Sequence, residues 1–369
     1  MIEFKLPSLG ADMDEGTLLE WRVKPGDAVK KGQVVAVVDT AKAAVDVECW
    51  QESTVAELVA EVGQKMPVGT VMARLQEAGA PEVSVAVPPA PTFGPRRMIS
   101  PAARKRAVEL GVDPAQLAGT GPQGAVTLED VEKATGAKPS TAATPDKAAE
   151  MRKAIAAAMA RSKREIPHYY VAEDIPLAKA LRWLQDENAQ RPMAERLLPA
   201  ALLLKAVAIT LKRYPELNGT FRDGAFVAAE RINLGVAISL RHGGLIAPAL
   251  LDAGTKPLTQ LMQELTDLVQ RTRAGSLKSS ELSEATITVT NLGDQGTQSV
   301  FGVIYPPQVA LIGFGRISER PWAEPGGIQA LPVITASLSA DHRVSDGHRG
   351  ALFLRDLAEQ LQHPEELDS

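Results

Sequence analysis

The sequence predicts three folded parts in one chain: an all-β flattened sandwich, a small helical domain, and a larger two-layer α/β domain. A repeated pattern of short strands fills the first part, two stretches rich in alanine and proline are typical of linkers, and strand-like and helical segments alternate in the last part. We expect the sandwich at 1–76, a linker at 77–97, the helical domain at 98–134, a second linker at 135–149 and the α/β domain at 150–369.

The prediction of a sandwich depends on an internal repeat. Residues 17–38 align without a gap on residues 54–75, so that Gly26 corresponds to Gly63. Each copy alternates apolar and polar residues around a glycine turn, which is typical of short strands with one buried face. Two such copies can pack face to face as a flattened β-sandwich.

The segment that joins the two copies carries an isolated lysine. In "VVDTAKAAVDV", Lys42 lies between two alanines, in a connection between two β-branched runs where nothing demands a positive φ. A lysine in a turn is most often a solvated charge. The place of Lys42 between the two copies, with no bulky residue beside it, favours a lysine that the fold presents.

Composition argues against several classes of protein. The 45% hydrophobic and 23% charged residues are ordinary for a globular protein, and a net charge of −5 argues against nucleic acid as the main partner. Cys49 is the one cysteine, so no intrachain disulfide can form. The most apolar stretch, 197–211, contains Lys205 and is too short to span a bilayer, and no signal peptide is visible. We therefore expect a cytoplasmic protein with no membrane span and no metal site.

Capping signals predict two short helices in the small domain. Ser100 followed by Pro101 is a helix start, and Thr127 with Asp130 is arranged like a capping pair for a second helix. The basic run 104–106 is either an electrostatic patch for an acidic partner or a solvated helix face. The residues alone leave both possibilities open.

The first candidate for chemistry in the α/β domain is "SADHRVSDG", between a predicted strand and the last predicted helix. His342 is a candidate general base, because the reference pKa of imidazole is about 6.5 and a thiol must lose its proton before it attacks an acyl carbon. His348 is a rival for this role. Asp346 either orders the loop or serves only as the N-cap of the helix.

The second candidate lies in "TITVTNLGDQG", where Thr290 ends a predicted strand. A hydroxyl at this place can donate a hydrogen bond to the oxyanion of a tetrahedral intermediate. The alternative is a β-branched residue that only packs within its strand.

Residues 1–76 resemble a lipoyl domain, in which lipoic acid acylates a lysine in a hairpin. That family usually has Asp-Lys-Ala, and this chain has Ala41-Lys42-Ala43. Biotin-carrying domains share the fold but usually place methionines beside the lysine, and none is present here. The resemblance implies lipoic acid attached to Lys42, which removes the lysine's charge and adds a long flexible arm.

The segment "LAGTGPQGAVTLEDV" resembles the peripheral-subunit-binding domain of 2-oxo acid dehydrogenase complexes. The resemblance places Arg104 at a position that binds partner enzymes. Val108 and Ala125 stand where that family commonly has arginines. We therefore expect partner binding that is weaker than usual or directed to a different partner.

The last part resembles the catalytic domain of dihydrolipoamide acyltransferases, a relative of chloramphenicol acetyltransferase. "DHRVSDG" is close to the histidine motif of that family, "ITVTNLG" matches its Ser-Asn-Leu-Gly segment with threonine in place of serine, and "IPHYY" and "GLIAP" also fit. The resemblance implies that His342 deprotonates the thiol, Thr290 stabilises the oxyanion, Asp346 holds the loop and Arg152 pairs with Asp346. It also implies an active site between neighbouring subunits of a trimer.

The resemblance implies an acyltransferase that moves an acyl group between dihydrolipoyl-lysine and coenzyme A. The implied partners are a thiamine-dependent 2-oxo acid decarboxylase and a flavoprotein dihydrolipoamide dehydrogenase, around a homotrimer or a higher multiple of trimers. One alternative is an inactive lipoyl-bearing scaffold that tethers partner enzymes, and another is an acyltransferase for a small free substrate. The sequence does not name the acyl group. Because its charged end, "HPEELDS", disfavours burial against another trimer, we expect assembly to stop at a trimer.

Overall fold

The computed structural model describes residues 1–9, 13, 15–40, 44–77, 103, 107, 117, 120–121, 125–135, 147–240, 244–293 and 296–368. The chain forms two compact units. One consists of Met1–Ala80 together with Lys147–Ser369, and the other is Pro81–Asp146.

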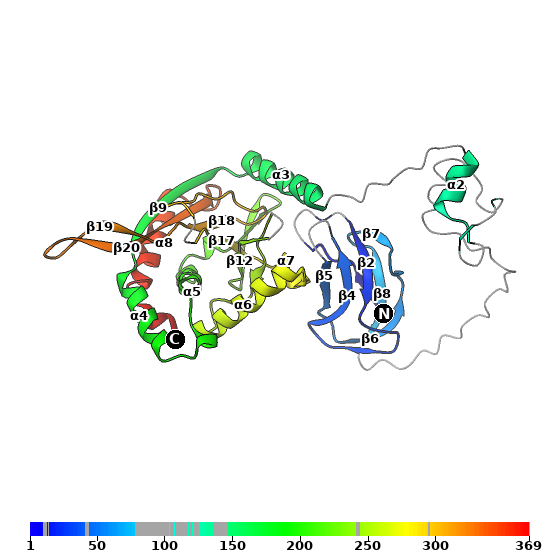
Figure 1. Cartoon of the computed structure of the whole chain (residues 1–369), viewed down its shortest axis with the longest axis horizontal. Coiled ribbons are helices and arrows are strands. Elements are labelled where there is room, and N and C mark those ends of the chain that lie inside the picture. The colour runs from blue at the N-terminus through cyan, green and yellow to red at the C-terminus, as the bar shows by residue number, and fades with distance from the viewer. Residues whose placement is uncertain are drawn as a thin grey trace. The chain divides into compact units, whose positions relative to one another are not determined.

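The N-terminal residues form the predicted all-β sandwich, drawn in blue in Figure 1. One sheet has the strand order β1-β8-β6-β3, and the other contains β5, β4, β2 and β7 in this order. The strands are β1 (Ile2–Lys5), β2 (Glu15–Trp21), β3 (Ala28–Val29), β4 (Gln33–Asp39), β5 (Ala44–Cys49), β6 (Ser53–Leu58), β7 (Lys65–Pro67) and β8 (Val71–Glu77). Apolar side chains, among them Leu18, Val45 and Met72, form one buried core.

The internal repeat explains this topology. Strands β2, β3 and β4 come from the first copy, and β6, β7 and β8 come from the second. Because β3 pairs with β6 and β7 pairs with β2, each copy gives a short strand to a sheet built mainly by the other. The equivalent turns have Gly26 at φ 94° and Gly63 at φ 87°, a left-handed conformation that favours glycine.

Lys42 lies outside the described residues, but the strands on both sides of it are described. β4 and β5 pair antiparallel, with Asp39 opposite Ala44. Residues 40–43 therefore connect two strands that are already paired, which agrees with the hairpin expected around Lys42.

The second unit has a small apolar core and one described helix, α2 (Leu128–Thr135). The capping pair predicted at its start is confirmed. The N–H of Asp130 donates to Thr127 Oγ1 at 3.4 Å, and Asp130 Oδ2 accepts from the N–H of Thr127 at 2.9 Å. Arg104 and the helix start at Ser100 lie outside the described residues.

The remaining residues form the predicted α/β domain around a seven-stranded sheet of order β15-β12-β17-β18-β20-β19, with β9 also paired to β20. Its strands are β9 (His168–Pro176), β12 (Leu234–Val236), β15 (Ala249–Leu250), β17 (Ile287–Asn291), β18 (Ala310–Phe314), β19 (Ser318–Glu324) and β20 (Gly327–Asp341). Shorter strands are β10 (Gly219–Arg222), β11 (Ala225–Ala228), β13 (Ile238–Ser239), β14 (Leu245–Ile246) and β16 (Leu277–Lys278).

The described part of this domain also contains helices. They are α3 (Lys147–Glu165), α4 (Ala178–Ala189), α5 (Pro199–Leu211), α6 (Leu258–Ala274), α7 (Ser279–Ser283) and α8 (Gly347–Gln360), with short 3-10 turns η3 (Met193–Glu195), η4 (Pro215–Leu217) and η5 (Pro364–Asp368). Figure 1 shows α4, α5, α6 and α8 together on one side of the sheet, where α5 packs against α6 and α8.

Helix α5 explains the most apolar stretch of the sequence. Almost all of its residues are buried, so the stretch is a core helix of the α/β domain. Even Lys205 is 1% exposed, and its Nζ donates to the carbonyl of Lys256 at 2.5 Å. Burial lowers the pKa of the Lys205 amine. Among the described residues, no helix is both long and apolar enough to cross a membrane.

Candidate active site

His342 follows directly after the longest strand of the sheet. β20 ends at Asp341, and α8 begins at Gly347, so the loop between them carries the histidine motif. The N–H of His342 donates to the carbonyl of Pro167 at 2.9 Å, just before β9. His342 is thus held by its backbone at the end of two paired strands, and its side chain is exposed in the single chain.

An ion pair between the buried Asp341 and the partly exposed Arg343 holds this loop. The Asp341 carboxylate is fully buried, and it accepts from Arg343 Nε at 2.9 and 3.1 Å, from Arg343 Nη2 at 2.6 Å and from the Arg343 backbone N–H at 2.9 Å. The Arg343 guanidinium also stacks on Phe221, with Cζ 3.9 Å from the ring centroid. The residues before and after His342 are therefore fixed to each other, a feature that sequence reasoning missed.

Tyr169 of β9 packs against the imidazole of His342. The ring centroids are 5.4 Å apart in an edge-to-face arrangement, and the phenol shares a hydrogen bond of 2.8 Å with Ser345 Oγ. Burial is the main cause that raises the pKa of the Tyr169 phenol. Tyr169 thus contacts both the imidazole of His342 and the side chain of Ser345 in the same loop. The "IPHYY" segment contains this residue, but its role depends on the pairing of β9 with β20.

Asp346 is the N-cap of α8. Its Oδ1 accepts from the N–H of Arg349 at 2.9 Å. This bond is the main cause that lowers the pKa of the Asp346 carboxyl, with smaller contributions from His348 and His342. Asp346 is therefore an N-cap, and its further role in holding the loop stays a prediction.

The expected partner of Asp346 is not beside it in the single chain. Arg152 lies on α3 with an exposed side chain, and the ion pairs of the described residues include none between Arg152 and Asp346. The pairing of these two residues stays a prediction.

Thr290 lies far from His342 within one chain. It is on β17 opposite Gly313 of β18, and Gly313 is opposite Ser337 of β20. His342 is the fifth residue after Ser337, so it lies about 17 Å further along the strand direction. Within one chain, Thr290 and His342 are therefore too far apart to contact the same thioester group. The structure brings His342, Asp346 and His348 together and leaves Thr290 at the other end of the sheet.

His168 is a second histidine near the motif, and its role is structural. Its Nε2 accepts from the N–H of Ile304 at 3.1 Å, so Nδ1 is the nitrogen that donates to the carbonyl of Ile166, at 2.8 Å. Burial is the main cause that lowers the pKa of His168. Both ring nitrogens are therefore occupied by the backbone, which leaves His342 and His348 as the histidines available for chemistry in this loop.

A cavity of about 830 Å³ opens beside the histidine loop. Arg343 lines it, together with the cationic side chains of Arg161 and Arg222 and the aromatic rings of Phe221 and Tyr305. Glu165 and Asp223 line it as well, so the cavity presents aromatic rings together with side chains of both charges.

Three known protein families match successive parts of this chain. The family described as 2-oxoacid dehydrogenases acyltransferase (catalytic domain) matches residues 141–368, biotin-requiring enzyme matches residues 2–75, and e3 binding domain matches residues 97–132. An acyltransferase domain, a small binding domain and a cofactor-carrying sandwich are thus combined in one chain. The chain belongs to the family of 2-oxoacid dehydrogenase acyltransferases. The three resemblances found in the sequence are confirmed.

Curated relatives match over nearly the whole chain. The dihydrolipoyllysine-residue acetyltransferase component of the pyruvate dehydrogenase complex from Staphylococcus aureus is 30% identical over 98% of both chains. A mitochondrial component of the same description from Arabidopsis thaliana is 30% identical over 99% of this chain and 79% of its own.

Solved structures match the α/β domain. A dihydrolipoamide acetyltransferase from Azotobacter vinelandii, studied for the roles of a serine, a histidine and an asparagine in its mechanism, is 27% identical with a TM-score of 0.56. The match covers 59% of this chain and 90% of that one. A probable dihydrolipoamide acetyltransferase from Listeria monocytogenes is 28% identical with a TM-score of 0.55, over 58% of this chain and 92% of its own.

Proposed function

We propose that this chain transfers an acyl group between dihydrolipoyl-lysine and coenzyme A within a 2-oxo acid dehydrogenase complex. The observation that carries the proposal is the braced His342 loop in a domain that belongs to the acyltransferase family. The same chain also carries the lipoyl and partner-binding domains that such a complex requires.

The proposed roles of the side chains are those that the resemblance to the acyltransferase family implies. His342 removes the proton of the attacking thiol as that thiol adds to the thioester carbonyl. Thr290 donates its hydroxyl hydrogen bond to the oxyanion that forms. When the carbonyl re-forms, the second thiol departs and His342 returns the proton to it, so the reaction is balanced and reversible. Asp346 keeps the loop on α8, and Arg152 is proposed to support Asp346.

The site is proposed to form between subunits of a trimer. Support comes from the strand register, which places His342 about 17 Å further along the strand direction than Thr290 in a single chain. In a closed threefold ring, each subunit can give His342 to the interface with one neighbour and Thr290 to the interface with the other. The exposure of the His342 side chain agrees with a second wall that another subunit provides.

Lipoic acid on Lys42 is proposed to supply the thiol that carries the acyl group. The pairing of Asp39 with Ala44 leaves one short connection for this lysine, which fits presentation to a ligase and to partner enzymes. The proposed partners are the thiamine-dependent decarboxylase and dihydrolipoamide dehydrogenase, with Arg104 among the residues that bind them. The cytoplasmic location stays a prediction from the sequence.

The test is coenzyme A-dependent acylation of free dihydrolipoamide by the purified chain, with a panel of acyl-coenzyme A thioesters. Acetyl is the first acyl group to try, because the relatives named above are acetyltransferases. We expect turnover with at least one thioester and none in His342→Ala. Absence of turnover with every thioester, from a folded and lipoylated chain, would favour the scaffold alternative.

A further inference from the structure

The lipoyl sandwich and the acyltransferase domain share one β-sheet. In its own sandwich β5 is the last strand of its sheet, and β16 of the other domain extends that sheet to the order β16-β5-β4-β2-β7. The pairing is parallel, with Leu277 opposite Val45 and Lys278 opposite Asp46. Addition of a strand to an exposed sheet edge is a common way for one protein segment to bind another.

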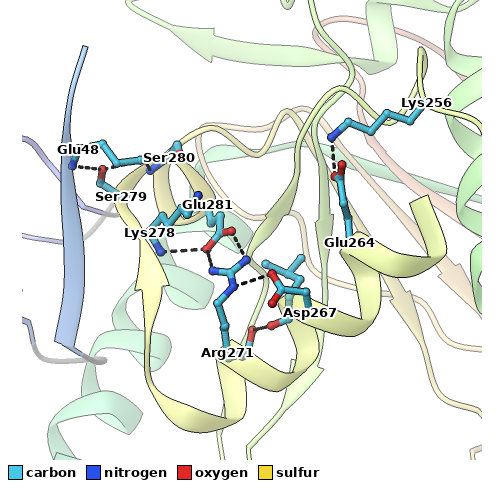
Figure 2. A network of polar contacts seen from close by, with 11 residues as sticks. Glu48, Lys256, Glu264, Asp267, Arg271, Lys278, Ser279, Ser280 and Glu281 are labelled. Atoms are coloured by element: carbon cyan, nitrogen blue, oxygen red, sulfur yellow. Dashed lines mark hydrogen bonds and ion pairs between the residues drawn. The ribbon is translucent and has the colours of Figure 1, made fainter. Parts of the chain in front are cut away.

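A carboxylate from the lipoyl sandwich reaches donors that belong only to the acyltransferase domain. Glu48 is 7% exposed, and its Oε2 accepts from Ser280 Oγ at 2.6 Å, from the Ser280 N–H at 3.2 Å and from Ser279 Oγ at 3.4 Å. The N–H of Glu48 in turn donates to Ser279 Oγ at 3.1 Å. Figure 2 shows these bonds bridging the blue strand β5 and the helix α7. Without the serines, this buried carboxylate would lose three of its hydrogen-bond donors.

Hydrogen bonds within the acyltransferase domain fix the segment that carries the two serines. Arg271 of α6 binds Glu281 of α7 through two bonds of 2.5 and 2.6 Å, and Glu281 also accepts from the N–H of Lys278 at 2.9 Å. Figure 2 shows this second layer of contacts on the α6 side of the serines. Because both ends of the segment 278–281 are fixed, the two serines are already oriented toward an incoming strand.

Apolar contacts complete the junction. Leu277 and Val45 are both fully buried, and Leu282 of α7 packs against the core of each domain. The junction therefore combines a short strand pairing, one buried carboxylate and a few apolar side chains. A junction of this limited size suits docking that forms and breaks.

We propose that β16 and α7 form a docking site for the lipoyl domain of the same chain, with the β5 edge and Glu48 as the groups it recognises. β5 begins two residues after Lys42, so docking keeps the strand that follows this lysine on the acyltransferase domain between visits to other enzymes. The linkers predicted from the sequence at 77–97 and 135–149 are long enough for the domain to leave this site. This docking goes beyond the proposed reaction and does not depend on it.

The test is a disulfide trap in the full-length chain. Asp46→Cys combined with Lys278→Cys places two cysteines at paired positions of adjacent strands, a spacing that a disulfide can bridge. Oxidised glutathione serves as the oxidant, and the rate of intrachain disulfide formation is followed by the mass of peptides. The matched control is Glu57→Cys with Lys278→Cys, because Glu57 is an exposed residue of β6 in the other sheet with the same tether.

We expect the Asp46 pair to form its disulfide at least about tenfold faster than the Glu57 pair. In the Asp46 pair, Glu48→Ala is expected to slow the trap about tenfold, and so is Ser279→Ala with Ser280→Ala, since both remove hydrogen bonds to a charged group. The two changes lie in different domains, and unaltered hydrogen exchange in β6 and β8 shows that the sandwich stays folded.

Equal rates of disulfide formation for the Asp46 and Glu57 pairs would overturn the proposal. A rate for the Asp46 pair that neither Glu48→Ala nor the serine changes reduce would overturn it as well. A disulfide between chains in place of one within a chain would overturn the assignment to the same chain. The trap requires no acyl substrate, so its failure would leave the proposed acyl transfer untouched.

Discussion

Arg343 grips the buried carboxylate of Asp341 through three side-chain bonds of 2.6–3.1 Å, and His342 lies between the two residues in sequence. The carboxylate also accepts from the backbone N–H of Arg343, which closes a tight turn around the histidine. The geometry of the proposed general base thus depends on an ion pair that takes no part in proton transfer.

Arg343→Ala is expected to leave the Asp341 carboxylate buried and unpaired. Loss of one partner of a buried pair costs about 3–5 kcal/mol, and because the Arg343 side chain is 33% exposed we expect about 2 kcal/mol of unfolding free energy. kcat should fall about tenfold or more, because His342 loses its fixed position. Denaturant unfolding and steady-state kinetics measure the two effects. The control is Arg213→Ala, whose side chain is 70% exposed in its pair with Asp356 and should cost less than about 1 kcal/mol. Equal losses in both variants would contradict the bracing role.

His348→Ala distinguishes the two histidines of the loop. His348 lies in the first turn of α8, and the change keeps its backbone N–H, which helps to lower the pKa of Asp346. We expect His348→Ala to keep kcat within about threefold, while His342→Ala loses about a hundredfold or more. The measurement is acyl transfer to free dihydrolipoamide. A reversed order of the two losses would assign the base to His348.

Asp130 is expected to make the small helical domain acid-sensitive. Its carboxylate accepts from the N–H and hydroxyl groups of Thr120 and Thr127, and these bonds, that of the Thr120 N–H first, hold the pKa of Asp130 well below its ordinary value. A lowered pKa in the folded state stabilises the fold fully above about pH 4, and the contribution is lost as the pH falls below that value. Hydrogen exchange of α2 from pH 6 to 3 should show loss of protection in the native chain. Asp130→Asn should be less protected at pH 6 and change less on acidification, and a profile identical to the native one would refute this role.

We expect that η5 does not join one trimer to another, so that the assembly is a single trimer. Leu367 of η5 is fully buried against the core of its own chain, while Glu365 and Glu366 remain exposed. The apolar side chains of η5, Pro364 and Leu367, are therefore already buried within the subunit, and the carboxylates of η5 disfavour burial against another trimer. Sedimentation velocity of the full-length chain should show a trimer at micromolar concentration. A predominant larger species, such as the cubic core known for a pyruvate dehydrogenase complex, would contradict this expectation.

The sequence predicts those features that local pattern controls. The gapless repeat and its glycine turns predict the sandwich, because alternation with one buried face leaves few other packings. The position of His342 after a strand and of Asp346 before a helix follows from short-range signals in the same way. These signals need no knowledge of which segments pair.

The remaining features depend on pairings between distant segments. The burial of Asp341 follows from its position on β20 between β18 and β9, and the packing of Tyr169 on His342 follows from the register of β9. The separation of Thr290 from His342 likewise follows from two strand registers. A motif places a residue type in the chain but gives no distance between two motifs.

The central claim is that one active site takes His342 and Thr290 from different subunits, and mixing of subunits tests it most directly. Thr290→Ala alone should lose about 10²–10³ in kcat, and His342→Ala at least as much. When the two variants are co-expressed in equal amounts, about a quarter of the sites in random trimers hold both native residues. We predict recovery to about a quarter of the native rate in the mixed assembly. Activity that stays at the average of the two separate variants would contradict the shared site.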